Sequence, residues 1–343
     1  MSLQDIKLTK SLLNNANNIV IVSHENPDGD TIGSSLALML VLKNMGKKVN
    51  VVINDDLPEF LKWIPGANEY LVYENNPNDV KQVVESSDLI FLVDFNDLDR
   101  MGKMKTVFST ISSKKCVMID HHPDPKEKCN VMFSFPGTSS TAELVYDFFV
   151  NLEFDNYIDK EVATCIYTGI ITDTGNFAFN SSSPHLFEVV SALLSKGVEK
   201  DDIYNKVYNN FSYDRMRLVG LGLHKRLVYW EKYNTAFIYY SKTDLVNYNH
   251  QKGDTENIVN IPMSIKGVFF SLLLIEKDDY VKMSFRSKGN FPANYIAKKY
   301  FNGGGHLNAA GGRCYKSLKE TIEDLKKVLE NDEIIKGFFD NSK

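Results

Sequence analysis

Residues 23–34 read SHENPDGDTIGS, and the rest of the chain is organised around this stretch. Residues 19–22 before it form a short apolar run typical of a buried strand, and the residues after it have the apolar spacing of a helix. The stretch is therefore predicted to be a strand-to-helix loop, where open α/β sheets place their ligands. Its Asn, Pro and Gly residues favour tight bends, so the loop can direct His24, Asp28 and Asp30 toward one point. The alternative is an Asp-rich turn that only caps the following helix.

Composition restricts the class of protein. The 343 residues are enough for two domains, and 43% hydrophobic with 24% charged residues is ordinary for a soluble globular chain. No apolar run is long enough to cross a bilayer and the polar N-terminus has no signal-peptide pattern, so we expect a cytoplasmic protein without membrane contact. The four cysteines lack C-x-x-C spacing and are expected to be reduced thiols. A net charge of −5 argues against binding to duplex DNA.

The first half of the chain alternates between strand and helix patterns, which predicts an α/β domain with a mainly parallel sheet flanked by helices. The predicted strands are residues 18–22, 48–53, 89–93 and 116–119, and the later predicted helices are residues 141–150 and 162–171.

The second half changes from a helical segment to a smaller α+β domain. Helices are predicted at 186–194, 203–209, 215–228, 293–300 and 318–329, and strands at 235–240, 268–275 and 281–286. The expected domains are residues 1–185, a helical linker at 186–230, and residues 231–343.

Three more groups of acidic or imidazole residues follow apolar elements directly. Asp94 ends one apolar run, Asp120, His121 and His122 end another, and Asp173 ends a helical pattern. Because the carboxyl ends of neighbouring parallel strands meet at one edge of a sheet, we expect these side chains to gather there.

The candidate ligands carry nitrogen and oxygen donors and no sulfur, a set that suits Mn²⁺ or Mg²⁺ better than a thiolate zinc site. They are His24, Asp28, Asp30, Asp94, His121 and Asp173. These are too many for one catalytic ion that must keep open positions. Two ions that share one carboxylate fit the number better, and such pairs activate water and clamp phosphoryl groups.

Four features of the first half resemble, in this order, the motifs of the DHH phosphoesterases: HENPDGD at 24–30, Asp94, DHH at 120–122 and Asp173. The stretches FRSKG at 285–289 and GGGHLNAAGG at 303–312 resemble the DHH-associated substrate-binding domain. That domain is typical of the branch with NrnA-type bifunctional oligoribonucleases and pAp phosphatases, RecJ-like nucleases and exopolyphosphatase-related proteins. The manganese pyrophosphatases of the family carry a different C-terminal domain.

The resemblance implies that residues 1–185 form the catalytic metal-binding domain. It assigns one ion to His24, Asp28 and Asp94, and the other to Asp30, Asp94, His121 and Asp173, with Asp94 bridging. Mn²⁺ is the favoured ion, with Mg²⁺ or Co²⁺ as alternatives. Besides Asp94, the expected catalytic residues are His122, which faces the substrate phosphate, and Asp120, which orients an imidazole.

Residues 231–343 are expected to bind substrate. Glycine-rich backbone can approach a phosphate closely, and Arg and Lys can pair with its oxygens, although a structural hairpin is the alternative for residues 303–312. The candidates in this domain are Arg286, Lys288, Gly304, Gly305, His306 and Asn308.

Three candidates for substrate binding lie in the first half of the chain. Ser139 and Ser140 open a predicted helix, where they can cap its N-terminus and also receive a phosphate. Arg100 can reach substrate or pair with Asp97 or Asp99, and the pairing is preferred.

The expected activity is that of a two-metal phosphohydrolase. Its substrates would be short oligoribonucleotides (nano-RNA), including linear dinucleotides such as pApA, and 3′-phosphoadenosine 5′-phosphate (pAp). The alternatives are an exopolyphosphatase, a RecJ-like single-strand exonuclease and a non-catalytic nucleotide sensor. Two domains joined by helices leave a homodimer open.

Overall fold

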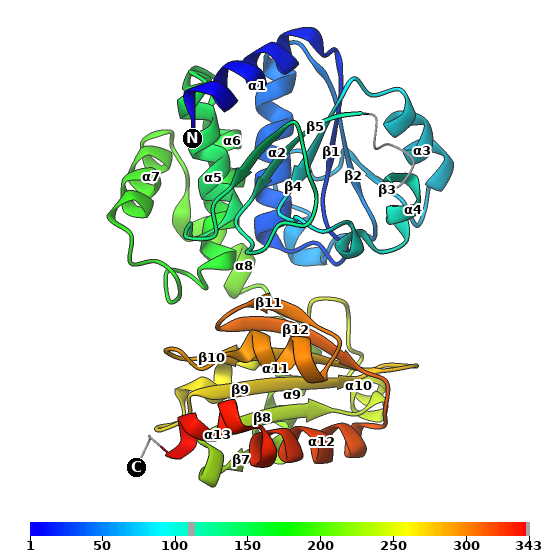
Figure 1. Cartoon of the computed structure of the whole chain (residues 1–343), viewed down its shortest axis with the longest axis vertical. Coiled ribbons are helices and arrows are strands. Elements are labelled where there is room, and N and C mark those ends of the chain that lie inside the picture. The colour runs from blue at the N-terminus through cyan, green and yellow to red at the C-terminus, as the bar shows by residue number, and fades with distance from the viewer. Residues whose placement is uncertain (109–113, 341–343) are drawn as a thin grey trace. The chain divides into compact units, whose positions relative to one another are not determined.

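The computed structural model describes residues 1–108 and 114–340. The chain divides into two compact units, Met1–Asn210 and Phe211–Lys343 (Figure 1). The predicted linker falls across this division. Helices α7 (Pro184–Ser195) and α8 (Lys200–Tyr208) pack on the core of the first unit, whereas α9 (Tyr213–Leu221) packs within the second. The expected domain boundaries stay a prediction.

The first unit is built on a six-stranded sheet with the order β3-β2-β1-β4-β5-β6, and every neighbouring pair is parallel. This confirms the predicted parallel sheet. Strand β4 is buried along its whole length, as its continuous apolar run predicts for a strand covered on both faces. The strands are β1 (Asn18–Val22), β2 (Lys48–Ile53), β3 (Tyr70–Val72), β4 (Leu89–Val93), β5 (Lys115–Asp120) and β6 (Val131–Ser134).

Helices cover both faces of this sheet, and each face has its own hydrophobic core (Figure 1). One core includes α1 (Leu3–Asn15), α2 (Gly29–Asn44), η1 (Glu59–Leu61), α5 (Thr141–Asn151) and α6 (Lys160–Asp173), with η3 (Asp155–Tyr157) between the last two. The other includes α3 (Pro77–Glu85), η2 (Leu98–Met104) and α4 (Lys105–Phe108).

Two glycines let α2, α5 and α6 pack at short range. A Cβ at Gly33 would lie 2.4 Å from the carbonyl oxygen of Cys165 on α6, and one at Gly169 would lie 2.5 Å from the Cβ of Ala142 on α5. Any larger residue would push these helices apart. The spacing matters because α2 carries Asp30 in its first turn and α6 ends at Asp173.

The second unit has a mixed sheet with the order β11-β12-β10-β9-β8-β7, in which only the β8–β9 pair is parallel. Its strands are β7 (Leu227–Trp230), β8 (Thr235–Tyr240), β9 (Phe270–Glu276), β10 (Val281–Ser287), β11 (Gly304–His306) and β12 (Ala309–Cys314). One core lies with α9, α10 (Lys242–Asn247) and η6 (Ile258–Ser264), and another with α11 (Ala293–Tyr300), α12 (Leu318–Asn331) and α13 (Glu333–Asp340).

One predicted element of the second unit is wrong. The helix expected at 215–228 ends earlier: α9 passes into the π-helix η4 (Gly222–Arg226), and the next residues form β7, followed by η5 (Glu231–Tyr233). Pairing of β7 with β8 overrides the local helical pattern there. The glycine-rich stretch at 303–312 forms the β11–β12 hairpin, as the structural alternative predicts, and its contact with substrate stays a prediction.

The expectation of four reduced thiols is also wrong for one pair. Cys116 and Cys129 form a disulfide, whereas Cys165 and Cys314 are buried free thiols. The pairing follows from the parallel neighbours β5 and β6, which bring the two cysteines together although they are 13 residues apart. In the described part of the chain, no helix has the length and apolarity needed to cross a membrane.

Candidate metal centre

The parallel sheet brings the predicted ligands together. Strands β1, β4 and β5 are neighbours, so the segments after them emerge at one edge. The ligand atoms of Asp30, Asp94 and His121 lie within 4.8 Å of one another, and so do those of His24, Asp28 and Asp94. Asp94 belongs to both groups.

Asp94 follows β4 directly, and its backbone is left-handed, with φ 65°. Its buried carboxylate accepts hydrogen bonds from two hydroxyls, Thr31 Oγ1 at 2.5 Å and Thr141 Oγ1 at 2.7 Å, one on each oxygen. Burial works to raise the pKa of Asp94, but the contact with His24 and the charge of His122 hold it well below its usual range. The carboxylate is therefore ionised and fixed in orientation.

The ring of His24 is oriented by the backbone. Nδ1 lies 2.7 Å from the carbonyl oxygen of Glu25, so it donates its proton there, and Nε2 faces Asp94 Oδ2 at 3.4 Å. Metal-binding histidines are commonly held in this way, with one nitrogen on a carbonyl and the other on the ligand side. Burial and Arg100 oppose protonation, but the hydrogen bond to Asp94 and nearby carboxylates leave the pKa of His24 raised.

Asp28 is exposed and caps α2, because its Oδ1 accepts from the amide of Thr31 at 3.0 Å. The helix-capping alternative for the loop is thus correct for this residue. The same carboxylate still lies in the group with His24 and Asp94, so capping and ion binding do not exclude each other here.

Asp30 is buried, and its two oxygens accept from the amides of Thr141 at 2.7 Å and Ala142 at 2.8 Å. Burial and the charges of Asp94, Asp173 and Asp28 raise its pKa well above the usual range. The carboxylate thus lies among like charges, where a cation would relieve the repulsion.

The amides at the start of α5 are therefore already used. Asp30 takes two of them, and Ser140 Oγ accepts the next, from Glu143, at 3.1 Å. The predicted phosphate site on free amides at this N-terminus is wrong for this arrangement. Ser139 Oγ is buried and has no partner among the described residues, and a role for Ser139 or Ser140 in substrate binding stays a prediction.

His121 faces three carboxylates. Its Nδ1 lies 3.4 Å from the Thr138 carbonyl oxygen, and Nε2 is 3.9 Å from Asp30, 3.8 Å from Asp94 and 3.7 Å from Asp173. Burial opposes a charge on the ring, but Asp173 and Asp94 leave the pKa of His121 raised. Three carboxylates around one imidazole give this point a negative environment that a divalent cation could neutralise.

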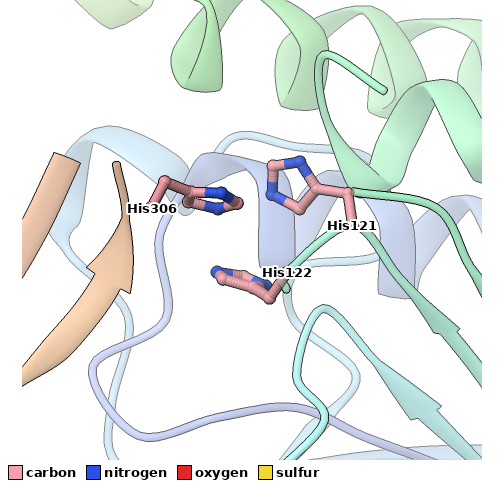
Figure 2. Close-up of side chains that lie close together, drawn as sticks. All are labelled: His121, His122 and His306. Carbon is pink, nitrogen blue, oxygen red and sulfur yellow. The ribbon is translucent and has the colours of Figure 1, made fainter. Parts of the chain in front are cut away.

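Figure 2 shows His121 and His122 on the loop after β5; the third histidine in it, His306, belongs to β11 of the second unit. The two neighbouring rings meet edge to face, with centroids 4.8 Å apart. His122 donates from Nδ1 to Asp120 Oδ1 at 2.7 Å and from its backbone amide to Oδ2 at 3.1 Å. Burial raises the pKa of Asp120 to about 7, and burial with Arg100 lowers the pKa of His122 well below its usual range. Asp120 therefore orients a neutral imidazole.

The predicted ion pair of Arg100 with Asp97 or Asp99 is wrong. Asp97 pairs with Lys126 and Asp99 with Lys105, and the Arg100 guanidinium instead donates to the backbone carbonyl of Asp94 at 3.4 Å. Its charge lies close enough to lower the pKa of both His24 and His122. The alternative role of Arg100, in substrate binding, fits this position.

The donors present fit a pair of hard or borderline divalent ions. They are imidazole nitrogens and carboxylate oxygens that converge without sulfur, which is the chemistry that Mn²⁺ and Mg²⁺ favour. Asp30, Asp94 and His121 are buried together, so a cation bound here would neutralise carboxylates that have little access to water.

In the second unit, strand register places two substrate candidates in one row. Arg286 on β10 pairs with Ala309 on β12, and Ala309 pairs with His306 on β11. Directly paired residues point to the same face of a sheet, so Arg286 and His306 flank the small side chain of Ala309.

The glycines of this hairpin differ in how much space surrounds them. A Cβ at Gly303 would lie 1.9 Å from the Gly311 carbonyl oxygen, and one at Gly305, which has φ 136°, would lie 2.5 Å from the Ala309 oxygen. At Gly304 nothing lies within 4 Å of the added atom. Packing explains the first two, whereas Gly304 leaves open space that a ligand could use.

Lys288 and Asn308 serve the fold of the second unit. Lys288 Nζ donates to the carbonyl oxygens of Met263 at 2.6 Å and Val268 at 3.2 Å. Asn308 Nδ2 donates to Ser287 Oγ and to the Gly289 carbonyl oxygen. Their predicted contact with substrate stays untested, and these bonds engage most of their donors.

No local pattern in the sequence indicated Thr31, Thr141 or Asn96, whose hydrogen bonds orient the groups of the site. The two threonines orient Asp94, and Asn96 Nδ2 donates to the carbonyl oxygens of His122 at 3.1 Å and Pro123 at 3.0 Å. A buried threonine in an apolar helix gives no local signal for such a contact. Only the position of Thr31 directly after Asp30 could have indicated one of them.

Family models match both halves of the chain. Residues 18–170 match the N-terminal domain of the DHH family, and residues 234–332 match the DHHA1 domain. The first match contains most of the metal candidates, and the second contains the row of Arg286 and His306.

Two relatives of the same name match over most of their length. The bifunctional oligoribonuclease and PAP phosphatase NrnA of Thermus thermophilus is 30% identical, over 91% of this chain and 88% of that protein. The protein of the same name from Bacillus subtilis is 24% identical, over 92% and 96%. A crystal structure of an exopolyphosphatase-related protein from Bacteroides fragilis is 42% identical, with TM-score 0.91 over 96% of both chains. The chain therefore belongs to the DHH family and carries a DHHA1 domain.

Proposed function

We propose that this protein is a phosphohydrolase that depends on two divalent ions, cleaves short oligoribonucleotides such as pApA, and removes a phosphate from pAp. Asp94 belongs to three groups of possible ligands, and the observation that carries the proposal is that two of them share it, one with His24 and Asp28 and one with Asp30 and His121. Two adjacent ion sites that share a carboxylate are typical of enzymes that cleave phosphate esters.

The ligand roles follow from this grouping. His24, Asp28 and Asp94 would hold one ion, and Asp30, Asp94, His121 and Asp173 the other. When bound, such ions activate water and stabilise charge on a phosphoryl group. Mn²⁺ is the proposed ion, with Mg²⁺ and Co²⁺ as alternatives.

His122 would act on the substrate through Nε2. Its Nδ1 proton is held by Asp120, and burial with Arg100 keeps the ring neutral, so Nε2 presents a lone pair. A neutral imidazole in this state accepts a proton or receives a hydrogen bond from the reacting group. Arg100 would supply the fixed positive charge that a neutral His122 lacks.

The second unit would hold the nucleotide. Arg286 can pair with two phosphate oxygens, His306 lies in the same row, and the backbone at Gly304 is open to a ligand. The substrate class is supported by the relatives named oligoribonuclease and PAP phosphatase, which this chain matches through both of its units.

Purified protein with Mn²⁺, Mg²⁺ or Co²⁺ would be assayed on pApA, pAp, long single-stranded RNA and polyphosphate. We expect turnover of pApA and pAp in the presence of a divalent ion, and none after chelation. Turnover of polyphosphate alone would instead support an exopolyphosphatase, and preference for long RNA a RecJ-like exonuclease. Nucleotide binding without turnover of any substrate would support a sensor.

A further inference from the structure

We propose that Thr141 is a positioning residue that fixes Asp30 and Asp94 relative to each other, so that the two ion sites exist before any ion binds. The inference rests on the proposed function, because it concerns the ligands of the same ions. Thr141 is the first residue of α5, directly after the capping residue Ser140, and it is fully buried.

One residue makes both connections. The backbone amide of Thr141 donates to Asp30 Oδ2 at 2.7 Å, and its side-chain Oγ1 donates to Asp94 Oδ1 at 2.7 Å. Asp30 lies on α2 and Asp94 follows β4, so the start of α5 joins two elements that are distant in sequence. Thr141 therefore links the two carboxylates directly, through its own amide and its own hydroxyl.

The connection opposes a repulsion. Asp30 and Asp94 are both buried, and their ligand oxygens lie within 4.8 Å of each other, so their like charges would push the side chains apart if nothing held them. Thr31 donates to one oxygen of Asp94 and Thr141 donates to the other. Together the two hydroxyls fix the direction of the lone pairs that remain for an ion. Partners of this kind typically change metal affinity by about 10- to 100-fold when they are removed.

Substitution can separate the two contacts. Thr141→Val keeps the volume and the amide bond to Asp30 but removes the hydroxyl bond to Asp94, whereas Thr141→Ser keeps both. Thr141→Ala is a second variant without the hydroxyl, for use if valine does not fold. Thr168→Val is a matched control, because Thr168 is also buried but donates only to the Thr164 carbonyl oxygen on α6.

The experiment is calorimetric titration of MnCl₂ into ion-free protein, with the melting temperature measured in parallel. We expect Thr141→Val and Thr141→Ala to weaken Mn²⁺ binding by about 10-fold, and Thr141→Ser and Thr168→Val to bind within about twofold of the unsubstituted protein. Thr141→Val or Thr141→Ala with unchanged affinity would overturn the inference, as would Thr141→Ser weakened as much as they are. If the unsubstituted protein itself bound no Mn²⁺, the proposed function would fail first.

Discussion

The two units each contain a cluster around buried carboxylates, and the clusters are built in opposite ways. In the second unit, Asp332 Oδ2 accepts from Tyr295 at 3.0 Å, Tyr300 at 2.6 Å and Lys299 at 3.0 Å, while Oδ1 accepts from the amide of Ile335. Burial alone would raise the pKa of Asp332, but these donors hold it below the usual range. This carboxylate is fully satisfied by its own fold.

In the first unit, the carboxylates face one another and two imidazoles. The pKa of Asp30 is raised by burial and by Asp94, and the pKa of His24 and His121 is raised by the carboxylates around them. Asp332 thus stabilises its fold, whereas Asp30 lies among like charges and costs stability until a cation is present. The contrast distinguishes a carboxylate that its own fold satisfies from carboxylates that lie among like charges.

The largest expected effect is on activity. Asp94→Asn keeps the shape of the side chain but removes the charge shared by both ligand groups. We expect hydrolysis of pApA to fall by more than about 100-fold, measured as kcat/KM with Mn²⁺. Asp332→Asn, in the other cluster, should leave kcat/KM within about twofold. Comparable losses of kcat/KM in the two variants would contradict the distinction between the two clusters.

The second effect is on stability through the ion. Saturation with Mn²⁺ at 100 times its dissociation constant should stabilise the folded first unit by about 2.7 kcal/mol. Hydrogen–deuterium exchange followed by mass spectrometry should show the protection in peptides around Asp94 and Thr141, with little change around Asp332. EDTA should reverse it. Equal protection in both clusters would contradict the assignment of the ions to the first unit.

The third effect is loss of the satisfied cluster. Asp332→Ala leaves the donors of Tyr295, Tyr300 and Lys299 without their acceptor, and we expect about 2 kcal/mol of destabilisation by urea unfolding. Tyr300→Phe removes one of these donors and should cost about 1 kcal/mol. An unchanged unfolding midpoint in Asp332→Ala would show that this cluster is not stabilising.

The same cluster predicts a pH dependence. The pKa of Asp332 is lower in the folded than in the unfolded chain, so the folded state binds fewer protons. Its contribution is present above the unfolded pKa of about 3.9 and is lost as the pH falls below that value. The difference in unfolding free energy between the unsubstituted protein and Asp332→Asn should therefore shrink from pH 6 to pH 3. A difference that grows toward acid would have the wrong sign.

The smallest effect concerns the hairpin of the second unit. Gly304→Ala adds a methyl group in open space, so folding should be unchanged while KM for pApA rises by about threefold, or ~0.6 kcal/mol. Gly303→Ala is the matched variant, and its clash with the Gly311 carbonyl oxygen should lower the melting temperature instead. If Gly304→Ala changed stability and not KM, the hairpin would be structural only.

Local patterns predicted much of the fold and the ligand set. The apolar run before Asp94 identified β4, and the same reasoning located the runs before His24 and Asp120. The strand at 227–230 was missed because its hydrogen-bond partner is another strand, and partners are not visible in a window of sequence. The Cys116–Cys129 disulfide was missed for the same reason.

By itself, the sequence determined which groups stand at the ends of the strands, because the period of apolar residues and the placement of glycine are local properties of the chain. The tertiary structure decided which of those groups share an ion site and what holds them. Thr141 contacts carboxylates 111 and 47 positions earlier in the chain. Arg100 donates to the Asp94 carbonyl oxygen and not to the side chains of Asp97 or Asp99. Such contacts depend on helix packing and strand order, which bring together residues whose side chains carry no sign of one another in the sequence.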